Sequence, residues 1–363
     1  MKIISCEVYS YKLPLVRQLQ INGEKILFRK GLILRIKDEE GYCGYGEIAP
    51  LPGLNTESLD ETLKQLKTFS AHFPDTVPPD LWKLEGAFEQ WFDGISFAPS
   101  VGFGIETAVL NLVANRRKTP LYKLISDNSR KRISVNALLT GKREDLLKET
   151  AQMLSHGYRS FKLKVGRSDM EKEVALVKEL SCLIGTGATL RLDANRAWAL
   201  DDAVGFTEAV SHTSIEYIEE PLRDIELLRD FIERSDIPVA VDESLHLLDF
   251  QLLSSFERIK AVILKPAVIG GLEKTAEYIR RAENLSILPV ISDTFHSGVG
   301  LSASAGLASG KLKKDVPAGL DTYRYLADDL LVERFSIEKG CLDLSVMDLN
   351  RKEPSPDKLQ KVM

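Results

Sequence analysis

The hydrophobic pattern of the first 125 residues changes from strand-like to helix-like. Apolar and polar positions alternate in residues 3–15 and again in residues 30–48, where a turn at residues 39–41 predicts a hairpin. Helical spacing follows in three stretches. The first begins at Thr56, and the other two cover residues 81–92 and 104–115. Strands followed by helices favour an α+β module.

A different pattern begins near residue 133, where short apolar or β-branched runs alternate with helical stretches. The runs are, in order, ISVNAL, SFKLKV, TLRLDAN, IEYIEEP, PVAVDES, AVILKP and LPVISDT. An eighth, shorter run is expected near residues 315–320. This βα repetition predicts a parallel sheet with crossover helices, and its length favours a closed barrel over an open sheet. One or two further strands are expected after residue 321, and a polar, loosely ordered tail from residue 350.

Charged residues mark the carboxyl end of almost every predicted barrel strand. They are Lys162, Lys164, Asp193, Glu219, Glu220, Asp242, Glu243 and Lys265. From Lys164 onward, successive strands place such a residue every 23 to 29 residues, about one βα unit apart. We therefore expect these side chains at a similar height around the barrel, at the end where barrel enzymes carry their active sites.

Strand alternation predicts which of these side chains face the barrel interior. Lys162 and Lys164 share one face of their strand, and Arg191, Asp193 and Asn195 share the interior face of the next. Carboxylates converging from adjacent strands form an oxygen-only site, which favours Mg²⁺ over zinc. A lysine desolvated beside other cations has a lowered pKa and can act as a base. Ordinary salt bridges are the alternative, and the matching register of the charges disfavours it.

Composition and charge narrow the class of protein. The net charge of −5 and pI of about 5.7 give no general attraction to nucleic acid or anionic membrane. No stretch reaches the roughly 20 apolar residues of a membrane span, so we expect no membrane insertion. The N-terminus shows no signal-peptide pattern, and the four cysteines have no metal-site spacing. The expectation is a cytoplasmic protein that acts on a small molecule.

Five motifs at barrel spacing resemble the enolase superfamily. They are KLK at residues 162–164, DANRAW at 193–198, IEEP at 218–221, VDES at 241–244 and LKP at 264–266. Within the superfamily the chain most resembles the o-succinylbenzoate synthase family of the muconate-lactonizing subgroup. That further resemblance is carried by GEIAPLPG at 46–53, LKPAVIGG at 264–271 and PAGLDT at 317–322.

The resemblance implies a (β/α)7β modified TIM barrel with an α+β capping domain. Residues 1–125 would form the cap, residues 126–320 the barrel, and residues 321–363 a segment that returns to the cap. The implied Mg²⁺ ligands, for which Mn²⁺ could substitute, are Asp193, Glu219 and Asp242; alternation alone does not decide between Glu219 and Glu220. Lys164 would be the general base, Lys162 its neighbour, and Lys265 the lysine across the site.

The implied reaction is a dehydration in menaquinone biosynthesis. The substrate 2-succinyl-6-hydroxy-2,4-cyclohexadiene-1-carboxylate would lose its α-proton to Lys164, giving a metal-stabilised enediolate. Expulsion of the β-hydroxyl then yields 2-succinylbenzoate. Lys265 would stay an ammonium on the opposite face of the ring.

Further expectations concern substrate contacts. Arg191 and Asn195 would orient lysine or substrate, with a structural ion pair as the alternative for Arg191. A loop containing Pro52 and Gly53 would form a wall of the pocket, and residues 18–23 a second mobile loop. The remaining candidates are Ser292, Ser297 and Gly298, whose N–H groups could hold the succinyl carboxylate, with an ordinary turn as the alternative. After the seventh predicted strand the chain has Asp293, Phe295 and His296, in a segment that is richer in serine in many family members.

Several rival functions share this constellation. N-succinylamino-acid racemase would use Lys265 as a second base. A dipeptide epimerase would need two acids near the last strand, where this chain has Asp321 but Tyr323. Muconate cycloisomerase ranks lower. A non-catalytic barrel is disfavoured because every implied ligand and both lysines are present.

Overall fold

The N-terminal part of the chain forms an antiparallel sheet. The computed structural model describes residues 1–21, 23–70, 73, 76–92, 95–346 and 353–363. The sheet has the order β14-β1-β2-β3 and consists of β1 (Ile3–Ile21), β2 (Glu24–Asp38), β3 (Cys43–Ile48) and β14 (Gln360–Lys361). The predicted hairpin is β2 and β3, and the first strand runs on to Ile21, beyond the predicted end at residue 15.

Short and long helices cover this sheet. They are α1 (Leu59–Ser70), η1 (Leu81–Lys83), α2 (Ala87–Trp91), α3 (Pro99–Arg116) and α4 (Leu121–Ile125). The single helix expected over residues 81–92 is wrong, because Leu84 and Gly86 take positive φ values of 55° and 95° and separate η1 from α2. The long helix α3 packs directly on β3. A Cβ at Gly46 would overlap the carbonyl oxygen of Gly104, so glycine is required there.

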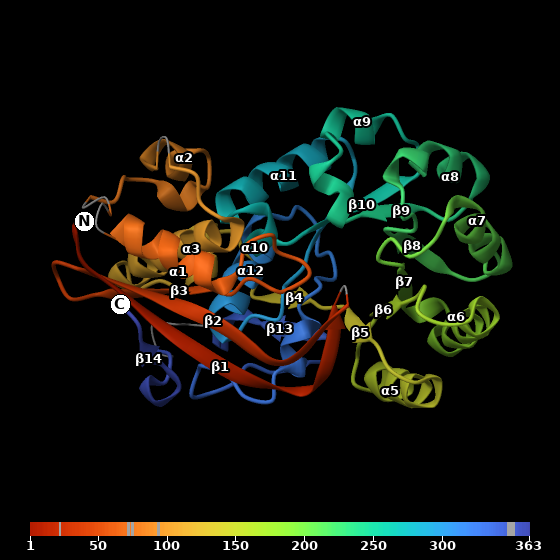
Figure 1. The fold of residues 1–363 in the computed structure, drawn as a ribbon, viewed down its shortest axis with the longest axis horizontal. Coiled ribbons are helices and arrows are strands. Elements are labelled where there is room, and N and C mark those ends of the chain that lie inside the picture. Colours follow the sequence, from red (N-terminus) through yellow and green to blue (C-terminus); the bar gives the residue numbers. More distant parts are fainter. Residues whose placement is uncertain (22, 71–72, 74–75, 93–94, 347–352) are drawn as a thin grey trace.

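The second pattern folds as predicted, as a parallel sheet with crossover helices (Figure 1). In the described part of the chain this sheet has seven strands in the order β11-β10-β9-β8-β7-β6-β5. The strands are β5 (Ala137–Leu139), β6 (Ser160–Lys164), β7 (Thr189–Asp193), β8 (Ile215–Glu219), β9 (Val239–Val241), β10 (Ile259–Leu264) and β11 (Leu288–Ile291). The helices are α5 (Arg143–Ser155), α6 (Met170–Ile184), η2 (Gly185–Gly187), α7 (Leu200–Ala209), η3 (Ile225–Leu227), α8 (Leu228–Arg234), η4 (Glu243–His246), α9 (Phe250–Ser254), α10 (Pro266–Ile269), α11 (Leu272–Asn284) and α12 (Gly298–Lys311).

Two residues close this sheet into a barrel. Ala318 bridges to Val135, just before β5, and Gly319 bridges to Ser292, just after β11, both in parallel orientation. Backbone hydrogen bonds of 2.8–3.1 Å support the contact on both sides. The short eighth run predicted near residues 315–320 therefore exists as a pair of bridges, and the (β/α)7β fold is confirmed.

The C-terminal segment runs back along the molecule. After η5 (Asp321–Tyr325), β12 (Ile337–Glu338) and β13 (Cys341–Asp343) pair with β4 (Arg132–Ser134) in a small antiparallel sheet, and η6 (Leu344–Val346) follows. Residues 350–352 of the predicted loose tail lie outside the described residues. The prediction is wrong for the last residues, because η7 (Pro356–Lys358) leads into β14, which pairs with β1.

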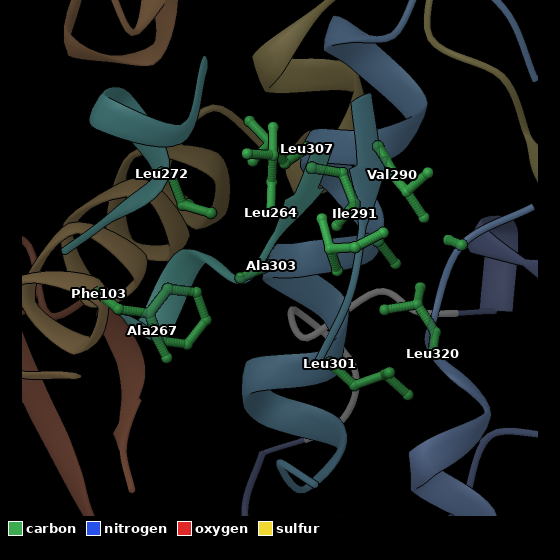
Figure 2. Packing of buried hydrophobic residues seen from close by; sticks show 14 of the residues in the cluster. Phe103, Leu264, Ala267, Leu272, Val290, Ile291, Leu301, Ala303, Leu307 and Leu320 are labelled. Carbon is green, nitrogen blue, oxygen red and sulfur yellow. The ribbon is translucent and has the colours of Figure 1, made fainter. Parts of the chain in front are cut away.

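One hydrophobic core joins the N-terminal sheet and the barrel. Figure 2 shows Phe103 of α3 beside Ala267 of α10, and Leu264 and Ile291 of the barrel strands near Ala303 of α12. None of the described helices is long and apolar enough to cross a membrane.

Candidate active site

Strand register brings the charged side chains together inside the barrel. Lys164 on β6 lies opposite Asp193 on β7, which lies opposite Glu219 on β8. Because side chains alternate along a strand, the three side chains point to the same side of the sheet. The carboxylates of Asp193 and Glu219 are completely buried.

Lys162 lies between two of these carboxylates. Its Nζ is 2.8 Å from Asp193 Oδ2 and 2.7 Å from Glu219 Oε1. Burial alone would lower the pKa of Lys162, but the charges of Asp193 and Glu219 outweigh burial and hold that pKa well above its usual value. Lys162 is therefore an ammonium ion in this arrangement.

Lys164 has a different environment from its neighbour. Its Nζ donates to Asp193 Oδ2 and to Asn195 Oδ1, both at 2.6 Å. Burial lowers its pKa, and the positive charge of Lys162 acts in the same direction. Lys162 therefore stays charged, whereas Lys164 loses its proton more readily. Acid–base catalysis requires a group of the second kind.

The opposite side of the site is built from the ends of β9 and β10. Lys265 forms an ion pair with Asp242. Burial would lower the pKa of Lys265, but Asp242 and Glu243 raise it above its usual value. Asn195 connects the two sides, since its Nδ2 donates to Glu243 Oε1 at 3.0 Å while its Oδ1 accepts from Lys164.

The structure separates the two adjacent glutamates at the end of β8. Glu219 faces the lysines, whereas the carboxylate of Glu220 accepts hydrogen bonds from Asp242 N, Ser244 N and Ser244 Oγ at 2.7–2.8 Å. Glu220 also has a φ of 44°, so the regular alternation of the strand ends at Glu219. Glu220 stabilises the turn after β9, and Glu219 is the carboxylate available inside the barrel.

Arg191 takes the structural alternative rather than a substrate contact. Its Nε donates to Glu216 at 2.7 Å and its Nη1 to the carbonyl of Pro317 at 2.8 Å, and the side chain is completely buried. It lies opposite Tyr217 in the register, one layer below Asp193. The ion pair fixes the barrel interior beneath the site.

The expected anion site at the start of α12 is already filled by protein carboxylates. Ser297 N and Gly300 N donate to Glu47 at 3.0 and 2.9 Å, and Gly298 N donates to Asp329 at 2.8 Å. The structure therefore does not support the expectation that Ser297 and Gly298 hold a substrate carboxylate. Ser292 Oγ is also engaged, at 3.4 Å from the carbonyl of Gly319.

The loop with Pro52 and Gly53 lies at the barrel mouth. It is anchored by Asn55, whose Nδ2 donates to the carbonyl of Ala267, two residues after Lys265, at 3.1 Å. Leu51 from this loop packs with Leu19 and Ile26 of the β1–β2 hairpin and with Tyr325. Residues 18–21, expected in a mobile loop, belong to β1, while residue 22 lies outside the described residues.

The unusual segment after β11 is buried. Asp293 Oδ1 lies 2.7 Å from His296 Nδ1, and burial would raise the pKa of Asp293, but His296 lowers it overall. Phe295 has a φ of 60°, and its carbonyl accepts from Arg29 Nε at 3.2 Å. This segment is held between the barrel and the N-terminal sheet.

The donor set suits a hard divalent cation. Asp193, Glu219 and Asp242 supply only oxygen atoms, and buried anions need a cation. As the side chains lie, lysine ammonium groups occupy the space between the carboxylates, and no three acidic, histidine or cysteine side chains of the described residues gather as a metal site. The ligand roles stay a prediction.

Sequence reasoning missed Glu47 and Asp329, which cap α12 from far along the chain. Glu47 lies in the GEIAPLPG motif, so the motif drew attention to the segment but not to this residue. Glu243, whose Oε2 is buried without a hydrogen-bond partner, was named among the charged strand ends but was given no role.

Family models match both parts of the chain. The model described as Enolase C-terminal domain-like matches residues 145–347, and the one described as MenC, N-terminal domain, matches residues 3–112. Among solved structures, muconate lactonizing enzyme from Pseudomonas fluorescens has a TM-score of 0.86 at 23% identity, covering 98% of both chains. Dipeptide epimerase from Enterococcus faecalis has a TM-score of 0.83 at 25% identity, covering 99% of this chain and 100% of the other.

Curated relatives extend the similarity along the sequence. Protein PHYLLO of Arabidopsis thaliana is 32% identical over 351 residues, and the match covers 85% of this chain but only 20% of that protein. The o-succinylbenzoate synthase of Haemophilus influenzae is 30% identical over 349 residues, covering 95% of this chain and 96% of the relative. The chain therefore belongs to the enolase superfamily and, within it, to the o-succinylbenzoate synthase family.

Proposed function

We propose that the chain is an o-succinylbenzoate synthase, which dehydrates 2-succinyl-6-hydroxy-2,4-cyclohexadiene-1-carboxylate to 2-succinylbenzoate. The observation that carries this proposal is the placement of Lys164 and Lys265. They extend from β6 and from the end of β10, four strands apart in the sheet order, each against a different carboxylate. In a closed barrel of this size, strands four apart face each other across the interior.

In the proposed mechanism, Asp193, Glu219 and Asp242 would hold Mg²⁺. Its positive charge would make the C–H beside the ring carboxylate of the substrate more acidic. Lys164 Nζ, in its neutral form and oriented by Asn195, accepts that proton. The C–O bond at the neighbouring carbon then breaks, and the hydroxyl leaves as water with the proton that Lys164 holds. The ring becomes aromatic, while Lys265 contributes a positive charge on the opposite face.

The test is a paired assay of the purified protein with Mg²⁺ and with a chelator. One arm follows dehydration of the cyclohexadiene carboxylate by absorbance, and the other follows α-proton exchange of an N-succinyl amino acid by NMR. Fast, Mg²⁺-dependent dehydration with slow exchange is the expected result. Fast exchange with poor dehydration would instead make the protein a racemase in which Lys164 and Lys265 both act as bases.

The epimerase alternative is disfavoured by the contacts of Asp321. This side chain is buried and accepts from Arg324 Nε at 2.6 Å and from Leu138 N at 2.9 Å. Tyr323, at the place of a second acid, donates its hydroxyl to Asp329 at 2.5 Å. Neither residue is available to bind a substrate ammonium.

A further inference from the structure

The proposed substrate carries a second carboxylate at the end of its succinyl tail, and this anion needs a partner at the barrel mouth. The start of α12 does not supply one, because Glu47 and Asp329 accept from its free N–H groups. A second anion beside these two buried carboxylates would be repelled. The partner must therefore lie elsewhere on the rim of the barrel mouth.

Arg17 is a cation on that rim. It lies on β1 at the point where the pairing of β1 with β2 shifts register, between Pro14 and Leu19. Its Nη2 donates to Tyr325 Oη at 2.9 Å, and its guanidinium lies 4.8 Å from the centre of the Tyr325 ring. Stacking and hydrogen bonding together fix the guanidinium plane, while the remaining N–H groups stay available.

The partners of Tyr325 place Arg17 close to the catalytic strand. Tyr325 Oη donates to the carbonyl of Leu138 at 3.0 Å, and Leu138 on β5 lies opposite Lys162 on β6. Gly141 follows β5 at its carboxyl end, and a Cβ at this position would lie 3.5 Å from Arg17 Nη1. Arg17 therefore lies above the carboxyl end of β5, one strand away from the lysine strand.

The surroundings of this guanidinium suit a tail with an apolar stem and an anionic end. Leu19, Ile26, Leu51 and Tyr325 form a small hydrophobic cluster, against which Leu138 and Phe295 also pack. Within the described parts of the chain, no carboxylate lies at ion-pair distance from Arg17. The neighbouring Arg324, by contrast, pairs with both Asp321 and Glu149.

We propose that Arg17 binds the terminal carboxylate of the succinyl tail and thereby selects substrates that carry it. This inference rests on the proposed function. A planar guanidinium that is already oriented can bind a carboxylate through two parallel hydrogen bonds. The hydrophobic cluster then covers the methylene groups between the ring and the tail carboxylate.

The test compares Arg17→Met with wild type in turnover and in binding of the stable product 2-succinylbenzoate. We expect KM and the product dissociation constant to rise about ten- to a hundredfold, with kcat nearly unchanged, because a charge-assisted hydrogen bond is lost. A product analogue whose terminal carboxylate is a carboxamide should bind wild type and Arg17→Met equally. Arg17→Lys should recover part of the affinity.

Lys12→Met is the matched control. Lys12 lies on the same strand and also stacks on an aromatic ring, 3.9 Å from the centre of Phe28, but outside the cluster at the mouth. The Lys12→Met variant should leave KM unchanged. If Arg17→Met weakens the binding of the product and of its carboxamide analogue equally, or weakens neither, the role of Arg17 is overturned. Absence of Mg²⁺-dependent dehydration in wild type would instead refute the proposed function.

Discussion

Glu219 and Glu220 show how the backbone gives two identical side chains opposite environments. Glu219 ends the regular strand and faces Lys162, whereas the positive φ of Glu220 turns its carboxylate toward Ser244 and the turn after β9. Alternation in the sequence could not decide between them, because Glu220 lies beyond the residues that alternate. The motif resemblance selected Glu219, and its role as a metal ligand stays a prediction.

Glu219→Gln and Glu220→Gln should therefore have different effects. Glu219→Gln removes a charge from the proposed metal site, so the Mg²⁺ concentration for half-maximal activity should rise at least about tenfold. Glu220→Gln should chiefly lower the free energy of unfolding, by about 1–3 kcal/mol, because its buried hydrogen bonds are weakened. Mg²⁺ titrations of activity and urea unfolding of both variants measure this, and the reverse order would overturn the choice of ligand.

Lys164→Ala tests the proposed base. Removing the group that takes the proton should lower kcat by at least about a hundredfold, while the urea unfolding midpoint changes little. Lys260→Ala is the control, because Lys260 lies on the exposed side of β10. Full activity of Lys164→Ala would exclude the mechanism, and reduced activity of Lys260→Ala would show that the assay reports general damage to the barrel.

At the scale of elements, buried carboxylates from distant segments cap the helices that start at the barrel mouth. Glu47 and Asp329 cap α12, and Glu106 of α3 accepts from Leu272 N and Glu273 N at the start of α11. Helices and strands were predictable from local periodicity, but these caps were not. Their partners lie far apart in the sequence, and only the folded chain brings them together.

Glu106→Gln should change the pH dependence of stability. Burial raises the pKa of Glu106 from 4.5 to about 8 in the folded chain. A raised pKa contributes stability that is present below pH 4.5 and is lost as the pH rises through about 8. Relative to Glu106→Gln, the free energy of unfolding of wild type should fall by about 1.4 kcal/mol per pH unit across this range. Urea unfolding at several pH values measures it, and parallel curves for the two proteins would contradict it.

At the scale of the molecule, βα repetition in the sequence was enough to predict a barrel, and the resemblance supplied its (β/α)7β form. The closing contact was predicted only as a short run near residues 315–320, because Ala318 and Gly319 form single bridges rather than a full strand. The return of the chain end was also missed, since residues 360–361 are too few to show strand-like alternation and pair with β1 only in the folded chain. The domain division at residues 125 and 320 stays a prediction.

Deleting residues 360–363 should destabilise the whole chain. Val8 N donates to Met363 O at 3.0 Å and Val362 N to Val8 O at 2.9 Å, so the deletion exposes the edge of β1. We expect a loss of about 2 kcal/mol in the free energy of unfolding. Lys361→Ala removes only the exposed ion pair with Glu7 and should cost less than about 1 kcal/mol. Urea unfolding distinguishes the two, and an unchanged deletion variant would show that β14 adds nothing to stability.

The closure of the barrel at Ala318 and Gly319 has a consequence for motion. A ring of strands opens where the fewest hydrogen bonds must break, and here that place is the boundary between β11 and β5. Amide protons at residues 318–319 should therefore exchange with solvent earlier than those of β7 and β8. Since Ser292 and Leu138 flank this boundary, its opening would widen the barrel mouth on the side of Arg17.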